Sequence, residues 1–158
     1  MKKLLILFTF LFSLISIITL TEKSAFNKNN SDSDSIEAMK KIYTDALNEQ
    51  IKGKEEWPAD SVFKDMQMMK KVPAGRLIMI MDKGFSKSLG VSCEHCHNTN
   101  DWASNEKKEK GIAREMMKMS GQIREMISNI KEIEPKETSV TCYTCHRGEV
   151  VPITRSKE

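Results

Sequence analysis

The hydrophobic pattern of the chain begins with an almost uninterrupted apolar run over residues 4–20, directly after Lys2 and Lys3. A short positive segment before such a run is typical of a secretory signal, and the run also lies at the short limit of a membrane-spanning helix. We therefore expect residues 1–25 to be a signal peptide or a retained N-terminal membrane anchor. Both alternatives export the rest of the chain. No cysteine stands directly after the run, which excludes a lipoprotein anchor.

The next segment, residues 26–35, is polar and predicts a flexible linker. From residue 36 onward, apolar side chains recur at helical spacing. Asp34 is the expected N-cap of this first helix, Glu37 completes the capping box, and Gly53 is the expected stop. The apolar positions of the helix are Ile36, Met39, Tyr43, Ala46 and Leu47.

Further helices are predicted on both sides of the first cysteines. A short helical piece is expected over residues 60–71, and Pro73 suits the first position of a helix over residues 73–89 that ends at Gly90. The apolar stripe of the latter is Leu77 or Ile78, Met81, Phe85 and Leu89. A longer helix is predicted over residues 104–133, with Pro135 as its stop. Its apolar face consists of Ile112, Met116, Met119, Ile123, Met126 or Ile127, Ile130 and Ile133.

No segment alternates between apolar and polar residues for long, so we expect an all-α fold. It contains two similar units, each a helix, a turn and a cysteine motif. A length of 158 residues allows one domain with a short appendage. We expect the domain to cover residues 36–153 and to be followed by a tail over residues 154–158. The formal charge of +3 gives no argument for a nucleic-acid partner. Aromatic content is only 6%, which predicts a thin apolar core.

All four cysteines lie in two copies of one pattern, Cys-x-x-Cys-His, at residues 93–97 and 142–146. Two Cys-x-x-Cys pairs can bind zinc, but zinc does not require a histidine after each pair. A redox dithiol belongs in a βαβ setting with a single motif, and a disulfide across two residues constrains little. Covalent haem accounts for every residue, because the two thiols form thioethers with the porphyrin and the histidine ligates the iron. Two motifs predict two covalently attached haem c groups.

The pattern assigns roles to both motifs. The predicted thioethers are formed by Cys93, Cys96, Cys142 and Cys145, and the predicted proximal iron ligands are His97 and His146. The one histidine left over, His95, is interpreted as a solvated loop residue rather than a ligand.

Methionine is the candidate for the second axial position of each iron, although most of the 11 methionines are expected to fill the core. Met81 lies on an apolar stripe, whereas Met79 shares its side with polar residues, which favours Met81 for the first haem. Met116 and Met119 both lie on the apolar face of the long helix. Helical periodicity leaves these two open for the second haem.

These motifs resemble the cytochrome subunit of bacterial photosynthetic reaction centres, over about residues 57–152. The matching pieces are VFKDMQMMKKVPAGRL, SLGVSCEHCH, the Ala-Arg-x-Met of the long helix and VTCYTCHRG. The resemblance implies paired haem modules in which each haem follows a helix carrying its methionine ligand. It implies Met81 for the first haem and Met116 for the second. A longer loop between Met116 and Cys142 keeps Met119 as an alternate, and the histidine that the family places in this loop has no counterpart.

The sequence therefore predicts an exported dihaem c-type cytochrome, periplasmic and either soluble or tethered by its N-terminal helix. It would carry electrons between redox partners, which are other redox proteins or membrane electron-transfer complexes. Two six-coordinate irons leave no place for a substrate, so we expect a carrier and not an enzyme. The alternative is a dihaem peroxidase-like or gas-sensing protein with one open iron site, and a zinc-binding module is the remote alternative.

Overall fold

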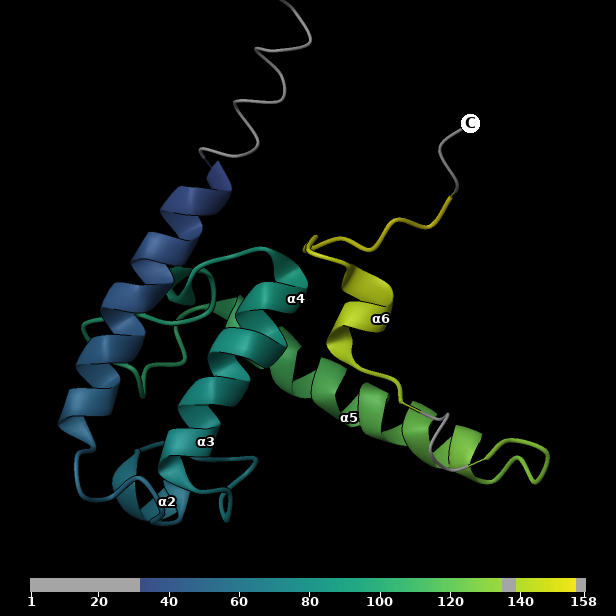
Figure 1. The fold of residues 1–158 in the computed structure, drawn as a ribbon, viewed down its shortest axis with the longest axis horizontal. Coiled ribbons are helices and arrows are strands. Elements are labelled where there is room, and N and C mark those ends of the chain that lie inside the picture. Colours follow the sequence, from purple (N-terminus) through teal and green to yellow (C-terminus); the bar gives the residue numbers. More distant parts are fainter. Residues whose placement is uncertain (1–31, 135–138, 156–158) are drawn as a thin grey trace, which may run out of the picture. The chain divides into compact units, whose positions relative to one another are not determined.

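The computed structural model describes residues 32–134 and 139–155 (Figure 1). The chain divides into two units, residues 1–35 and 36–158, and the second contains both cysteine motifs. Within the described ranges all regular structure is helical, apart from isolated bridges between Pro58 and Pro73 and between Asn98 and Asp101. The predicted all-α class is confirmed. The expected signal or anchor and most of the expected linker lie outside the described residues.

The N-terminal helix covers each described residue from 32 to 50. Asp34 was predicted to be the N-cap of this helix. That prediction is wrong, because residues 32 and 33 before it are already helical. The predicted stop at Gly53 is confirmed. The chain leaves the helix through a turn over residues 51–53, and Gly53 has a φ of +78° that favours glycine.

Of the short helix expected over residues 60–71, only its beginning is helical, as α2 (Ala59–Val62). The rest is a loop. It includes Asp65 and Met69 at φ values of +57° and +55°, which a continued helix does not allow. The bridge between Pro58 and Pro73 closes this loop, so that the chain enters the next helix beside the place where α2 began.

The helix predicted over residues 73–89 is continuous but not uniform. It consists of α3 (Ala74–Met79), a π-helical segment η1 (Ile80–Ser86) and α4 (Lys87–Leu89), with Pro73 as its N-cap. The apolar positions 77, 81, 85 and 89 step by more than the roughly 3.6 residues of an α-helical turn. A wider π turn keeps them on one face, and such segments are frequent at functional sites. Met81 lies in this segment.

The apolar core lies between the end of the N-terminal helix, α2 and α3. Its buried members are Ile51, Ala59, Ala74, Leu77 and Ile78, and Leu47, Val62 and Phe63 pack against it. No residue described after Ser88 is buried. The half of the unit that carries both cysteine motifs therefore lacks a core of its own.

A buried ion pair joins the N-terminal helix to η1. The side chain of Lys40 is only 3% exposed, and its Nζ lies 2.9 Å from Asp82 Oδ1 and 2.7 Å from Glu37 Oε1. Burial acts to lower the pKa of Lys40, but hydrogen bonds from its ammonium to Glu37 and Asp82 outweigh burial and raise it. Lys40 is thus a charged anchor next to the segment that carries Met81.

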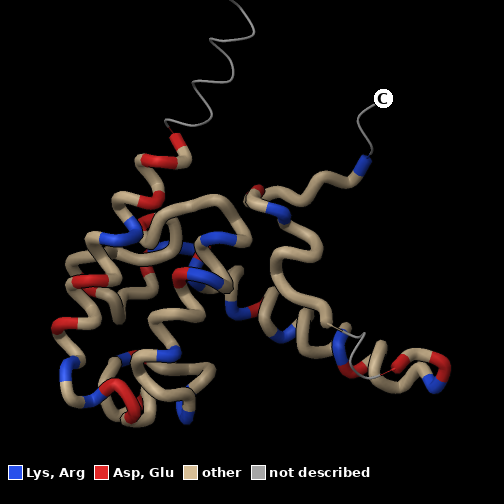
Figure 2. Tube along the Cα trace, viewed as in Figure 1, with Lys and Arg blue, Asp and Glu red and all other residues tan. Residues whose placement is uncertain are grey.

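The long helix α5 runs over Lys108–Ser128, shorter at both ends than the predicted range of residues 104–133. It ends before Pro135, which lies outside the described residues. The first motif forms a 3-10 turn, η2 (Cys93–His95), and the second forms a short helix, α6 (Cys142–His146). Acidic and basic residues are interspersed along the trace (Figure 2). No helix in the described ranges is long and apolar enough to cross a membrane.

Candidate haem attachment sites

The first motif is a single tight turn. The amide N–H groups of Cys96 and His97 both donate to the Cys93 carbonyl, over 3.3 and 3.1 Å. The turn begins three residues after Gly90, which ends α4 as predicted and has a left-handed conformation. The η2 turn packs against η1. Two thiols, one imidazole and the segment containing Met81 therefore belong to one local structure.

The thiols of the first motif are partly buried and free. Burial is the largest cause that raises the pKa of both Cys93 and Cys96. Both groups are therefore protonated at neutral pH, which keeps them from acting as exposed thiolate nucleophiles.

The imidazole of His97 is withdrawn from solvent. Burial, followed by the positive charge of Lys110, lowers its pKa, so the ring is neutral at pH 7. Its buried Nδ1 has no hydrogen-bond partner among the described residues. A neutral imidazole with an unpartnered buried nitrogen fits a metal ligand better than a satisfied core histidine.

An aromatic ring packs beside His97 and is itself contacted by a second aromatic ring. The ring of Trp102 lies 5.4 Å from the His97 ring, and Tyr43 of the N-terminal helix meets Trp102 edge-on at 5.9 Å. The Tyr43 hydroxyl donates to the Glu94 carboxylate within the motif, and this bond is the main reason why the pKa of Tyr43 is raised. The N-terminal helix thus contributes directly to the first site.

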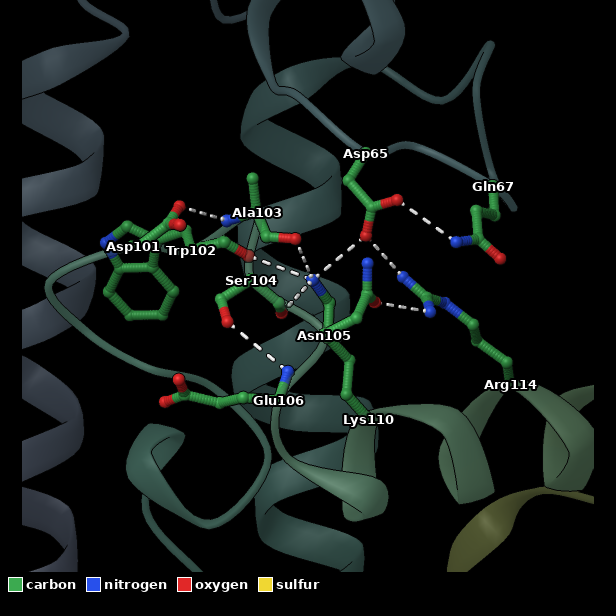
Figure 3. A network of polar contacts seen from close by, with 10 residues as sticks. All are labelled: Asp65, Gln67, Asp101, Trp102, Ala103, Ser104, Asn105, Glu106, Lys110 and Arg114. Carbon is green, nitrogen blue, oxygen red and sulfur yellow. Dashed lines mark hydrogen bonds and ion pairs between the residues drawn. The ribbon is translucent and has the colours of Figure 1, made fainter.

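The loop that carries Trp102 is held by a network centred on Lys110 (Figure 3). The Lys110 ammonium lies 2.9–3.0 Å from three consecutive carbonyl oxygens, those of Trp102, Ala103 and Ser104. It also lies 3.1 Å from Asp65 Oδ2. One cation from α5 therefore fixes the loop that packs on His97.

Asp65 completes the network from the loop before α3. Its Oδ2 also accepts a 2.7 Å bond from Arg114, and its Oδ1 accepts a 3.0 Å bond from Gln67. The hydrogen bonds from Gln67 and then Lys110 are the largest causes that hold the pKa of Asp65 well below its usual range. The carboxylate therefore remains ionised and ties the loop before α3 to α5.

The second motif has a different local structure. In α6, Thr141 is the N-cap and forms a capping box with Thr144. The helix ends at Arg147 and Gly148, both with positive φ. Cys142 is partly exposed and Cys145 is exposed, and both are free thiols. α6 packs against α4 and η1.

His146 is prepared as a ligand by a local bond. Its Nδ1 lies 3.0 Å from the Glu149 carbonyl oxygen, so Nδ1 carries the proton and donates. The ring nitrogen that faces away from this bond, and that a metal would contact, is then Nε2. A histidine that ligates a metal characteristically donates its other ring nitrogen to a carbonyl in this way.

The candidate methionines differ in exposure. Met81 is partly buried, whereas Met79 is 53% exposed. On α5, Met116 and Met119 are similarly exposed, at 43% and 46%. The leftover His95 is partly buried within η2. The identity of the methionine that ligates each iron stays a prediction.

The α5 helix tests whether the chain fits haem. None of its residues is buried, although it carries an apolar face with Ile112 at 50% exposure and Met116 at 43%. Such a face needs an apolar partner, and a porphyrin attached to the nearby motifs is one. The free thiols, the neutral imidazole of His97 and this uncovered face together fit haem.

The arrangement does not fit the zinc alternative. Among the described residues, no three side chains of His, Cys, Asp or Glu gather closely enough to hold a metal ion. The two cysteine pairs therefore do not converge on a shared tetrahedral site. Each motif is a separate site.

The sequence did not reveal the residues that support the first site. Trp102, Lys110 and Asp65 come from three segments and meet only in the folded chain. The resemblance did include Asp65 and Arg114 within its matching pieces, and that match was the available signal for their pairing. The π turn at Met81 had a signal too, in the four-residue steps of its apolar stripe.

Helices that present two Cys-x-x-Cys-His turns define a c-type cytochrome. The chain belongs to the family of the photosynthetic reaction centre cytochrome c subunit, whose sequence model matches residues 21–155. The predicted family is confirmed. Membership in a cytochrome c family implies covalently bound haem c.

Individual relatives are similar over shorter stretches. The photosynthetic reaction center cytochrome c subunit of Thermochromatium tepidum is 34% identical over 97 residues, which is 60% of this chain and 22% of that protein. Cytochrome c-554 of Chloroflexus aurantiacus is 31% identical over 85 residues, 53% of this chain and 20% of that protein. The corresponding subunit of Rubrivivax gelatinosus is 37% identical over 60 residues, 38% of this chain and 15% of that protein. The chain thus spans about a fifth of the length of the curated relatives that it matches.

Proposed function

We propose that this chain is an exported dihaem c-type cytochrome that carries electrons between partner proteins. The observation that carries the proposal is the presence of two complete Cys-x-x-Cys-His turns in one chain. Each has free thiols and a histidine that supplies a ring nitrogen for a metal. Residues 36–153 form the dihaem domain in this proposal, and residues 1–25 export or anchor it.

The proposed ligand sets follow the two motifs. Thioethers form at the paired cysteines 93 and 96 and at the pair 142 and 145, while His97 and His146 are the proximal ligands. Met81 is the proposed distal ligand of the first haem, because it is partly buried in the π turn packed against the first motif. Met116 is the proposed distal ligand of the second haem, with Met119 as its alternate and Met79 as the alternate for Met81.

In a c-type cytochrome, the haems and the polypeptide chain have different roles. The bound haems supply the one-electron chemistry, and the chain sets their axial ligands, spacing and solvent access. With histidine and methionine on each iron, no coordination position is left for a substrate. The proposed partners are therefore other redox proteins or membrane electron-transfer complexes outside the cytoplasmic membrane. Nothing in the comparisons supports an open iron site.

The test is a haem count on the mature protein. Expression with a c-type haem maturation system, followed by intact-mass measurement and a pyridine haemochrome assay, is expected to give two covalent haems per chain. The same mass spectrum reports whether residues 1–25 are retained. One haem or none would contradict the proposal. Carbon monoxide binding to the reduced protein would show an open iron and contradict the carrier role.

A further inference from the structure

The two motif turns meet through a pair of glycines. Gly90 ends α4 three residues before Cys93, and Gly148 follows His146 by two residues. The Gly148 N–H donates to the Ser88 carbonyl over 2.9 Å, and Ser88 is buried. One backbone bond therefore links the end of the first helix to the segment that leaves the second motif.

The contact at Gly90 leaves no room for a side chain. A Cβ placed there would lie 3.1 Å from the Gly148 carbonyl carbon and closer still to its oxygen. The neighbour in this contact is backbone, which cannot rotate away as a flexible side chain could. Gly90 also has a φ of +66°. Both the conformation and the close approach therefore require glycine at residue 90.

The same segment also holds His146. The Glu149 N–H donates to the His146 carbonyl over 2.9 Å, and the Glu149 carbonyl accepts from the imidazole of His146. The turn over residues 146–149 thus orients the second imidazole on one side and rests on Gly90 on the other. α6, which precedes this turn, packs against α4, which precedes Gly90.

We propose that the Gly90–Gly148 contact fixes the position of the two haem attachment turns relative to each other, and thereby the electronic coupling between the two haems. Gly90 is a positioning residue in this proposal, since it touches neither haem ligand set. The inference rests on the proposed dihaem function. It extends that function by naming the element that sets the path between the two redox centres.

The experiment compares Gly90→Ala with one matched variant, both as holoproteins. Gly53→Ala also places alanine at a positive φ, +78°, but its Cβ atom would meet nothing within 4 Å and Gly53 lies outside the proposed contact. The readout is the excitonic couplet in the Soret circular dichroism, which depends on the distance and angle between two haems. Haem absorption and haem count are recorded on the same samples.

We expect the couplet of the unaltered protein to be lost or inverted in Gly90→Ala, with two haems and normal absorption retained. Gly53→Ala should keep it. An unchanged couplet in Gly90→Ala, or no couplet in the unaltered protein, overturns the inference while a count of two haems leaves the proposed function intact. Fewer than two haems in the unaltered protein would refute the proposed function instead.

A second measurement covers the case in which Gly90→Ala does not fold. Amide hydrogen exchange of the unaltered holoprotein should show slow exchange at the Gly148 N–H, because it is bonded to the buried Ser88 carbonyl. Exchange at the rate of an unstructured amide would overturn the inference.

Discussion

The two haem motifs share a sequence pattern but differ in how much protein surrounds them. His97 has a neutral, partly buried ring covered by Trp102, and the loop behind it is fixed by Lys110. His146 is held by one local bond to the Glu149 carbonyl, and Cys145 beside it is exposed. The first site is therefore built by packing, and the second by a capped turn of the chain.

The difference indicates how each site depends on its cofactor. The small apolar core lies between the end of the N-terminal helix, α2 and α3, and the same N-terminal helix supplies Tyr43 to the first site. The helix α5 has no buried residue of its own. The proposed second haem would supply what α5 lacks, so its binding contributes to folding in the way that bound cofactors generally stabilise the native state.

Removing one attachment site at a time tests this contrast and has the largest expected effect. Cys93→Ala with Cys96→Ala, and Cys142→Ala with Cys145→Ala, should each remove one haem per chain. We expect the second pair to cost more helix, because it leaves the apolar face of α5 without a partner. Far-ultraviolet circular dichroism and binding of a hydrophobic dye measure the loss.

The single variants Cys93→Ser and Cys142→Ser are the controls, since each keeps one thioether and the proximal histidine. Equal loss of helix in the two double variants would remove the contrast between the sites. Greater loss in the variant that lacks the first attachment would reverse it.

Replacing the proposed distal ligands has the next largest effect. Met81→His is expected to lower one midpoint potential by on the order of 0.1–0.3 V, a part of the roughly 0.8 V range over which axial ligands set haem potentials. The physical reason is that imidazole stabilises ferric iron more than a thioether does. Potentiometric titration of the holoprotein measures the shift, and the methionine-to-iron charge-transfer band of the oxidised protein should weaken in parallel.

Met79→His is the matched control, because Met79 is two residues away and half exposed. A shift with Met79→His and none with Met81→His would reassign the first ligand. On α5, the same pair of experiments at Met116 and Met119 decides which sulfur serves the second haem, where similar exposures leave the choice between them open.

Most of the secondary structure and both motifs could be predicted from the sequence. Helical spacing predicted the N-terminal helix and the helix that ends at Gly90, because a single apolar face needs a regular repeat. The Cys-x-x-Cys-His pattern is local, so it can be found without knowledge of the fold. The predicted cap at Asp34 was wrong, since capping residues also occur inside helices and the pattern cannot tell the two apart.

The tertiary parts of the first site could not be predicted. Asp65 and Lys110 lie far apart in sequence, and nothing in their own neighbourhoods marks them as partners. The Gly90–Gly148 contact is equally non-local, although each glycine alone is recognisable as the end of a helical segment. Local patterns determine turns and helices, whereas contacts between segments depend on how the whole chain packs.

The buried pair of Lys40 and Asp82 offers a third test, directed at the packed side of the comparison. Lys40→Met should destabilise the holoprotein by about 3 kcal/mol, because it leaves the Asp82 carboxylate largely buried with the exposed Lys83 as its remaining ion-pair partner among the described residues. Lys41→Met, which breaks an exposed pair with Asp45, should cost less than about 1 kcal/mol. Urea unfolding measures both, and equal costs would show that the Lys40 pair is not an anchor.

The smallest expected effect is at Asp65, whose carboxylate ties the loop before α3 to α5 through Lys110 and Arg114. Its side chain is 21% exposed, so solvent screens the pairs in part. Because the fold lowers the pKa of Asp65, the ionised carboxylate stabilises the fold at neutral pH. That contribution is lost as the pH falls below the usual carboxyl value of about 4 and through the lower pKa of the folded state.

Asp65→Asn should therefore lower the free energy of unfolding at pH 7, and the difference from the unaltered protein should shrink in acid. Urea unfolding followed by circular dichroism at several pH values measures this difference. Any acid effect on haem ligation that is common to both proteins cancels in it. Asp45→Asn, at an exposed pair within one helix, is the control and should differ little from the unaltered protein. A difference at Asp65 that stays constant with pH would mean that its hydrogen bonds, and not its charge, join the packed first site to α5.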